Sequence, residues 1–268
     1  LSDPWYFFSV FNKGWRLLHE NEIKYVESVL SKSSHIYISH EHPDHFNPKF
    51  LLDERIKKLI LKNNITFLFQ ETKDKRVVNF LKKSGFFVQE CKLDKVINLS
   101  EEVKIKISKH DFYDSSIAIF TPDYKILNLN DCPLKEKSEI DNFQKKHGDF
   151  DILLTQFSYA AWKGSESNVT LRQIAAQEKI QAIISQYKIL NCKHVIPFAS
   201  YIYFSNKMNF YMNDSVNKPS NLQENLTKEN IKSVIMSPGE IQNLNNLKQK
   251  QESLEFWKNK FNLNKNNI

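Results

Sequence analysis

The strongest constraint on this 268-residue chain is a short segment in which metal-ligand side chains crowd behind an apolar run. The run His35–Ile38 predicts a short buried strand, and it leads directly into the segment Ser39–His45. Where a strand runs into a turn, residues two apart lie on one side. We therefore expect His40 and His42 to bind one metal ion together.

The turn that follows adds two more ligand types, Asp44 and His45. Imidazole and carboxylate are ligands that zinc, iron and manganese accept in proteins. We expect these two side chains to face a second position. The alternative, surface histidines on a polar loop, would require three histidines and one aspartate to fall within six residues by chance.

The rest of the chain alternates expected helices with expected strands, which indicates an α/β layered fold. A hairpin is expected where the runs 116–120 and 125–129 flank a Thr-Pro-Asp-Tyr turn. We expect one domain over residues 1–240 and a polar C-terminal helix, within 241–268, packed on it. The other expected elements are helices at 20–31, 49–62, 73–83, 171–189 and 223–231, and strands at 35–38, 65–69, 86–91, 103–107, 152–155, 194–197 and 233–236.

Composition and charge narrow the expected binding partners and the expected cellular compartment of the protein. The net charge of +7 is spread along the chain, which favours a solvated lysine-rich surface and leaves open the attraction of an anionic substrate. No helix-turn-helix, zinc-finger or RNP-like pattern is present, so we expect no nucleic-acid partner. Three distant cysteines indicate no disulfide framework and fit a reducing cytoplasm. No apolar run reaches about 18 residues, so we expect no membrane partner.

The pattern His-x-His-x-Asp-His after a strand resembles the signature of the metallo-β-lactamase superfamily. This resemblance implies an αββα four-layer sandwich with metal bound at one edge of the sheets. It also implies that Asp3 braces the histidine loop, that Asp131 is a bridging carboxylate, and that His110 is the third imidazole of the first metal. The chain starts at Leu1 on an expected strand end, which leaves open whether the first strands of the fold are missing.

Further runs resemble one branch, the metallo-β-lactamase-like domain of CMP-N-acetylneuraminate hydroxylases, over about residues 2 to 240. The runs are 3–5, 14–20, 36–40, 125–132 and 197–199. This resemblance implies oxidation of the N-acyl group of an amino sugar or sugar nucleotide at an iron centre. It also implies electrons from a Rieske iron–sulfur centre.

Two departures from the pattern shape the expected site. The paired Cys-x-His and Cys-x-x-His motifs of a Rieske centre are absent. The iron–sulfur donor therefore lies upstream of Leu1, belongs to a separate protein, or is not used. No histidine follows the strand 194–197, where the superfamily has its last one.

We therefore favour one metal, iron or zinc, held by His40, His42 and His110 with Asp131 close by. Asp44 and His45 would support these ligands or hold a weak second metal. Asp114 is the substitute candidate for His110.

The expected substrate contacts lie in a turn-like stretch after the strand 152–155. Tyr159 and Trp162 would stack on a sugar ring, and Lys163 would meet a phosphate. Ordinary loop packing is the alternative for all three. Arg16 and Tyr203 are further candidates for the pocket wall.

Three functions compete on this evidence. The first is the hydroxylase that the resemblance implies. The second is a hydrolase of the same fold, in which a metal-bound water attacks an ester, amide or phosphodiester and Asp44 or Asp131 orients that water. The third is a scaffold that has lost its chemistry, which only the missing last histidine supports.

Overall fold

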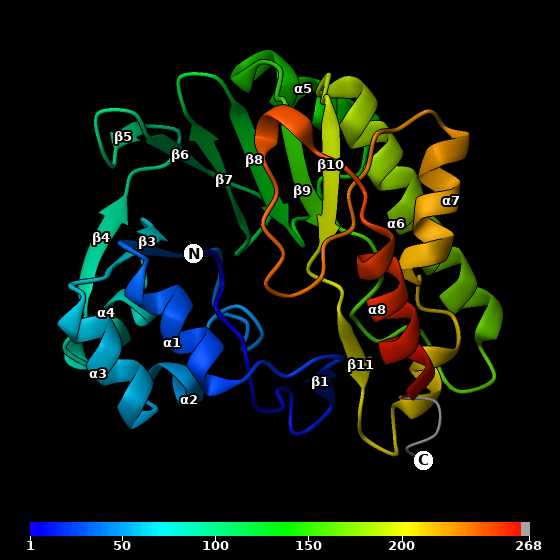
Figure 1. Ribbon diagram of the computed structural model, residues 1–268, viewed down its shortest axis with the longest axis horizontal. Helices are drawn as coiled ribbons and strands as arrows, with labels where there is room; N and C mark the ends of the chain where they lie inside the picture. Colours follow the sequence, from blue (N-terminus) through cyan, green and yellow to red (C-terminus); the bar gives the residue numbers. More distant parts are fainter. Residues whose placement is uncertain (264–268) are drawn as a thin grey trace.

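The computed structural model describes residues 1–263, and in it two β-sheets lie face to face between two layers of helices (Figure 1). This is the αββα sandwich that the resemblance implied. Each interface between layers has its own apolar cluster. Between the sheets, Tyr37 and Leu68 of the small sheet pack against Ile105, Ile107 and Ile117 of the large one. None of the described helices is both long and apolar enough to span a bilayer.

The larger sheet has six strands in the order β10-β9-β8-β7-β6-β5. β8, β9 and β10 are mutually parallel, while the remaining neighbours are antiparallel. The expected hairpin is confirmed as β7 and β8, whose turn is closed by a hydrogen bond from the Thr121 amide to the Tyr124 carbonyl. The strands are β5 (Val96–Asn98), β6 (Lys104–Lys109), β7 (Ser115–Phe120), β8 (Lys125–Asn130), β9 (Ile152–Gln156) and β10 (His194–Phe198).

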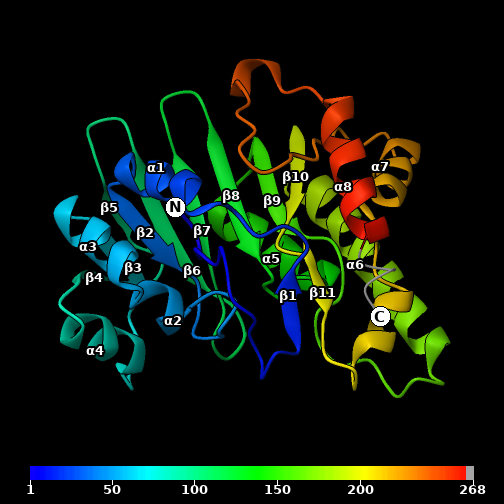
Figure 2. The ribbon, with the colours of Figure 1, turned by 60° about the horizontal axis from the view of Figure 1, so that its bottom comes forward.

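The smaller sheet is parallel, in the order β2-β3-β4, and helices cover its outer side (Figure 2). Its strands are β2 (His35–Ile38), β3 (Thr66–Gln70) and β4 (Phe87–Cys91). A third sheet pairs β1 (Trp15–Leu17) with β11 (Ile202–Phe204). The helices are α1 (Ile23–Ser31), α2 (Pro48–Leu51), α3 (Glu54–Lys62) and α4 (Arg76–Lys83).

One helix was expected over 49–62, but the structure has two, α2 and α3. Asp53 has an extended backbone, with φ −54° and ψ 130°, which ends the first helix. Its carboxylate accepts hydrogen bonds from the amides of Arg55 and Ile56 and so caps the second. The sequence pattern is helical on both sides of Asp53, and the cap that Asp53 forms divides the expected helix into α2 and α3.

Helices on the other side of the large sheet bury its outer face (Figure 2). They are α5 (Lys137–His147), α6 (Val169–Ile189), α7 (Pro219–Lys228) and α8 (Gln251–Leu263), with short 3₁₀ segments at Phe210–Asp214 and Leu244–Asn246. Trp257 and Phe261 of α8 are buried in this core, and Trp257 stacks on Tyr201 at 3.8 Å between ring centroids.

The strand expected at 233–236 is wrong. Only Ser233 pairs, in a single bridge with Val195. The side chain of Gln249 bonds both the amide and the carbonyl of Ile235, so the backbone groups that would extend the pairing already have partners.

Candidate metal centre

The histidine loop leaves the small sheet at the end of β2, and Asp3 holds it in place. The Asp3 carboxylate accepts hydrogen bonds from the Ser39 amide (2.7 Å), the Ser39 hydroxyl (2.8 Å) and His45 Nδ1 (3.0 Å). Asp3 itself is anchored by a hydrogen bond from its amide to the Tyr37 carbonyl. The expectation that Asp3 braces the histidine loop is confirmed.

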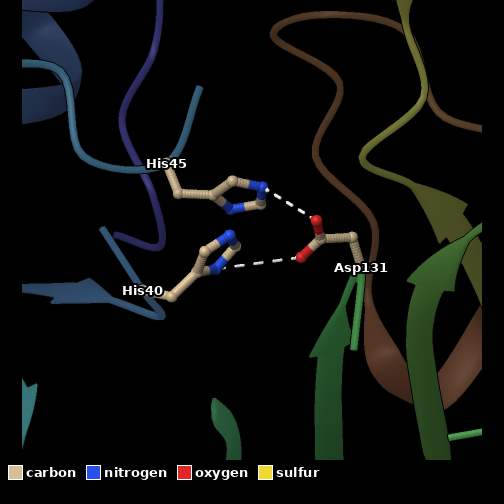
Figure 3. Close-up of side chains that lie close together, drawn as sticks. All are labelled: His40, His45 and Asp131. Atoms are coloured by element: carbon tan, nitrogen blue, oxygen red, sulfur yellow. Dashed lines mark ion pairs between the residues drawn. The ribbon is translucent and has the colours of Figure 1, made fainter. Parts of the chain in front are cut away.

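Three side chains from both sheets converge at this edge: His40, His45 and Asp131 (Figure 3). One ligand-type atom from each lies within 4.8 Å of the others. The two oxygens of Asp131 face different imidazoles, at 3.9 Å from His40 Nδ1 and 3.4 Å from His45 Nε2. Both histidines are buried, at 1% and 6% exposure. Two buried imidazoles and the half-buried carboxylate of Asp131 together are a ligand set for a transition metal.

A local irregularity aims Asp131 into this group. The pairing of β8 with β9 shifts register between Asn128 and Asn130, and Asn130 adopts a left-handed conformation with φ 52°. The Asn128 side chain accepts a hydrogen bond from the Asn130 amide and stabilises the turn. Asparagine tolerates this conformation better than most residues, so the strand ends here and the next side chain faces the small sheet.

His42 and Asp44 flank the group. His42 Nδ1 lies 2.8 Å from His40 Nε2, and its ring is exposed at the mouth of a cleft. Asp44 Oδ2 lies 3.3 Å from His45 Nε2. The structure therefore brings five of the six expected metal-site residues into one neighbourhood: His40, His42, Asp44, His45 and Asp131.

Comparison with known proteins finds relatives that match most of this chain. No family model matches the chain. The sequence is 26% identical over 265 residues to the cytidine monophosphate-N-acetylneuraminic acid hydroxylase of Xenopus laevis, across 91% of this chain and 43% of that protein. It is 26% identical over 255 residues to the hydroxylase of Sus scrofa, across 88% of this chain and 55% of that protein. The chain thus spans about half the length of these curated relatives.

Solved structures that superpose on this chain identify its fold. The diiron β-hydroxylase CmlA of Streptomyces venezuelae superposes with a TM-score of 0.52 at 14% identity, covering 74% of this chain and 42% of that one. The metallo-β-lactamase fold protein YhfI of Bacillus subtilis superposes with a TM-score of 0.51 at 10% identity, covering 80% and 79%. The chain has the metallo-β-lactamase fold. The resemblance to the hydroxylase branch that the sequence motifs indicated is also confirmed.

His110 was expected to be the third imidazole ligand of the metal, but the structure places it away from His40 and His45. The His110 ring lies against Phe143, with 5.3 Å between centroids, and its Nε2 is 2.8 Å from the Ser116 hydroxyl. It lines a different cavity, on the side of α5. The loop that begins at His110 closes with a hydrogen bond from its amide to the Asp114 carbonyl. Asp114, the substitute candidate, is the residue that reaches the site, with Oδ1 3.5 Å from His40 Nδ1.

The donor set fits a metal ion. Oδ1 of Asp44 and Oδ1 of Asp131 are buried, and neither has a hydrogen-bond partner among residues 1–263. A buried carboxylate oxygen without a donor is costly, and a cation would offset that cost. His40 Nε2 and His42 Nδ1 lie 2.8 Å apart, closer than the about 3.3 Å between two tetrahedral ligands of one zinc ion, so here they form a hydrogen bond that a shared metal ion would have to replace.

The pKa values of the two buried histidines shift in opposite directions. Burial and the neighbouring His45 lower the pKa of His40 to about 4, so its imidazole is neutral and able to ligate at pH 7. Burial also disfavours a charged His45, but Asp131, Asp3 and Asp44 outweigh that effect and hold the pKa of His45 well above its usual range. Without a metal, His45 is therefore positively charged and stabilised by the surrounding carboxylates.

The pKa values of the two acidic residues beside His40, Asp114 and Asp131, shift in opposite directions. Burial would raise the pKa of Asp131, but His45 and His40 hold it well below its usual range, so this carboxylate is ionised. Burial and the charge of Asp131 raise the pKa of Asp114 to about 6. Asp114 therefore titrates close to neutral pH.

A cleft of about 360 Å³ opens beside the metal-site residues. Of the expected substrate contacts, Tyr159 and Lys163 line it. Trp162 is 72% exposed and bonds to the Tyr211 hydroxyl instead. Arg16 is exposed on β1, opposite Tyr203 of β11, and Tyr203 lines a separate cavity. The structure therefore separates Trp162, Arg16 and Tyr203 from this cleft.

Among the amide and charged side chains of the cleft wall, sequence reasoning missed two: Gln156 and Lys179. Gln156 had a usable signal, because it ends a strand parallel to the one before Asp131, and such ends meet at one edge of a sheet. Lys179 had none. Its helix α6 is long and mixed in character, and only packing selects the side that faces the site.

Proposed function

We propose that this chain is the metal-binding part of an oxidising metalloenzyme that acts on the N-acyl group of an amino sugar or sugar nucleotide. The observation that carries this proposal is the group formed by the buried His40 and His45 with Asp131, in a chain whose curated relatives are named as hydroxylases. Electrons would come from a separate Rieske-type centre, as the branch resemblance implies. The chain spans about half the length of those relatives, so the activity of the whole relatives is part of this proposal.

Five residues would hold the metal, iron or zinc. Asp3 occupies Nδ1 of His45, so Nε2 of His45 is the nitrogen free to ligate, and this second contact fixes the ring orientation. His40, His42, Asp44 and Asp131 supply the remaining donors. Phe198 and Ala199 line the cavity beside Asp44 and His45, where the resemblance would place a last histidine. The missing imidazole favours one metal over two.

A bound metal would supply Lewis acidity and, if it is iron, redox chemistry. The chain's own groups would position the substrate and handle protons. Asp131 stays ionised, while Asp114 can hold or release a proton at its carboxyl near pH 6, beside His40 Nδ1. Tyr159 and Lys163 form the cleft wall against which the substrate would lie.

A hydrolase is the second candidate. The buried, unpartnered oxygens of Asp44 and Asp131 favour it, because paired carboxylates at a metal site can orient an attacking water. Asp44 and Asp131 would then be the catalytic residues toward an ester, amide or phosphodiester. The same geometry serves both chemistries, so the metal and its reaction distinguish them.

Elemental analysis of anaerobically purified protein tests the proposal. We expect about one iron per chain, oxygen uptake when a reductant is supplied, and loss of the metal in His42→Ala and His45→Ala. His194→Ala is the matched control, because His194 lies at the start of β10, the opposite end of the strand from Phe198 at the site. Zinc with oxygen-independent hydrolysis would support the hydrolase. A folded wild-type protein that takes up no metal would refute both and favour a scaffold.

A further inference from the structure

Two lysines lie on the wall of the cleft beside the metal centre, and the proposed function assigns no role to Lys179. Lys163 follows β9, and Lys179 comes from the middle of α6. Both line the same cavity as His42, Asp44 and Asp131. Neither ammonium group has a carboxylate within ion-pair distance in the part of the chain that the structure describes.

Lys179 is held in a fixed position. Its Nζ donates a hydrogen bond to Oε1 of Gln156, a buried residue at the end of β9. The side chain itself is half-buried, with Ala175 on the same wall. A lysine whose stem is buried and whose charge is bonded only to a neutral amide retains most of its capacity to bind an anion.

Positively charged side chains repel one another along this wall of the cleft. Burial lowers the pKa of Lys179, and although Asp131 opposes this, Lys163 and Lys135 repel its charged form. Placing like charges on one cavity wall destabilises the protein unless a ligand compensates them. If a cation is bound at Asp44 and Asp131, the carboxylates of the site are neutralised and this part of the cleft becomes more positive still.

The cleft continues in two directions with different chemistry. A cavity of about 160 Å³ shares Gln156, Tyr159, Lys163 and Lys179 with the cleft and extends to Lys135. On the other side, a cavity of about 390 Å³ meets the cleft at Trp15, Asp44 and Ala160. Several rings line that second cavity, among them Trp5, Tyr6, Trp15, His19, Tyr201 and Trp257. A substrate at the metal centre would thus meet a basic wall on one side and an aromatic wall on the other.

We propose that Lys163 and Lys179 form an oxyanion-binding subsite, which holds a phosphate or carboxylate group of the substrate while the metal centre faces the reacting group. This inference deepens the proposed function by assigning its anionic substrate to two named residues. The anion binding itself requires no turnover. Lysine binds such groups as a point charge, which suits both phosphate and carboxylate.

Calorimetric titration with two probes tests this subsite. Cytidine 5′-monophosphate supplies a phosphate and N-acetylneuraminic acid a carboxylate, and uncharged cytidine is the reference ligand. We expect Lys179→Gln and Lys163→Gln each to weaken binding of at least one anionic probe about tenfold and to leave cytidine unchanged. Loss with the nucleotide alone identifies a phosphate subsite, and loss with the sugar acid alone identifies a carboxylate subsite.

Two control variants keep the test decisive. Lys188→Gln makes the same change on the same helix, but Lys188 pairs with Glu229 outside the cleft, so its probe affinities should match the wild type. Lys179→Arg keeps the charge and should retain most of the affinity, which separates charge from folding. The proposal is overturned if both glutamine variants bind both anions as the wild type does, or if the wild type prefers neither anion to cytidine.

Titrating both the metal-free and the metal-loaded protein separates this inference from the proposed function. A protein that takes up no metal, yet loses anion affinity in Lys179→Gln, refutes the proposed function and supports the subsite. A protein that binds iron and consumes oxygen, with unchanged anion affinity in both variants, supports the proposed function and refutes the subsite.

Discussion

Replacing Asp3 by Asn should weaken metal binding through His45, although Asp3 is not expected to touch the metal. The Asp3 carboxylate accepts three hydrogen bonds, two from Ser39 and one from His45 Nδ1. An amide of the same shape can accept at only one end. At the other end its NH₂ group would face a donor, and the neutral His45 that ligates a metal could avoid that clash only by moving its proton from Nδ1 to Nε2.

That tautomer change would protonate the nitrogen that faces Asp131. Loss of such outer contacts typically costs 10- to 100-fold in metal affinity. Losing a hydrogen bond to a charged acceptor also costs about 1.5–3 kcal/mol of folding stability. Asp3→Asn should therefore bind iron or zinc on the order of 10- to 100-fold more weakly and lose about 2 kcal/mol of unfolding free energy without metal.

Chelator competition would give the metal affinity, and urea unfolding of the metal-free protein would give the stability. Asp53→Ala is the control, because Asp53 also accepts amide hydrogen bonds but caps α3 away from the site. It should lose about 1 kcal/mol of stability and keep its metal affinity. Wild-type metal affinity in Asp3→Asn, or an equal loss of affinity in Asp53→Ala, would refute the reasoning.

Four further outcomes are expected. Asn130→Ala should cost about 1 kcal/mol in urea unfolding because of the left-handed backbone, whereas Asn130→Gly should cost less. Burial lowers the pKa of His110 to about 4, below its ordinary value of 6.5, so the unfolded chain binds more protons between these pH values and stability falls as pH drops. From pH 7 to 5 this loss is on the order of 2 kcal/mol, and His110→Gln should show a shallower pH dependence in the same assay. Trp257→Ala should destabilise the protein by about 3–5 kcal/mol, since it removes a buried ring stacked on Tyr201; an unchanged melting temperature would contradict the packing of α8. Saturating metal at 100 times its Kd should stabilise the wild type by about 2.7 kcal/mol, and a chelator should reverse the shift in melting temperature.

The sequence by itself determined the features that depend on local periodicity and close spacing. The run His35–Ile38 is a strand because its apolar residues pair with β3 and are covered on both faces, and the dense ligands after it can only lie at a sheet edge. The same local logic located the 116–120 and 125–129 hairpin. The motif resemblance added Asp3 and Asp131, which lie far apart in sequence but on both sides of the histidine loop in the structure.

Only the tertiary structure decided which side chains cross between the sheets. His110 and Asp114 lie four residues apart in one loop, and the register of β6 with β7 sends the first toward α5 and the second toward His40. Gln156 and Lys179 meet because α6 packs across the end of β9, and no local pattern records that packing. Side-chain direction in a loop and the rotation of a helix over a sheet are set by long-range packing, so residue type and spacing cannot determine them.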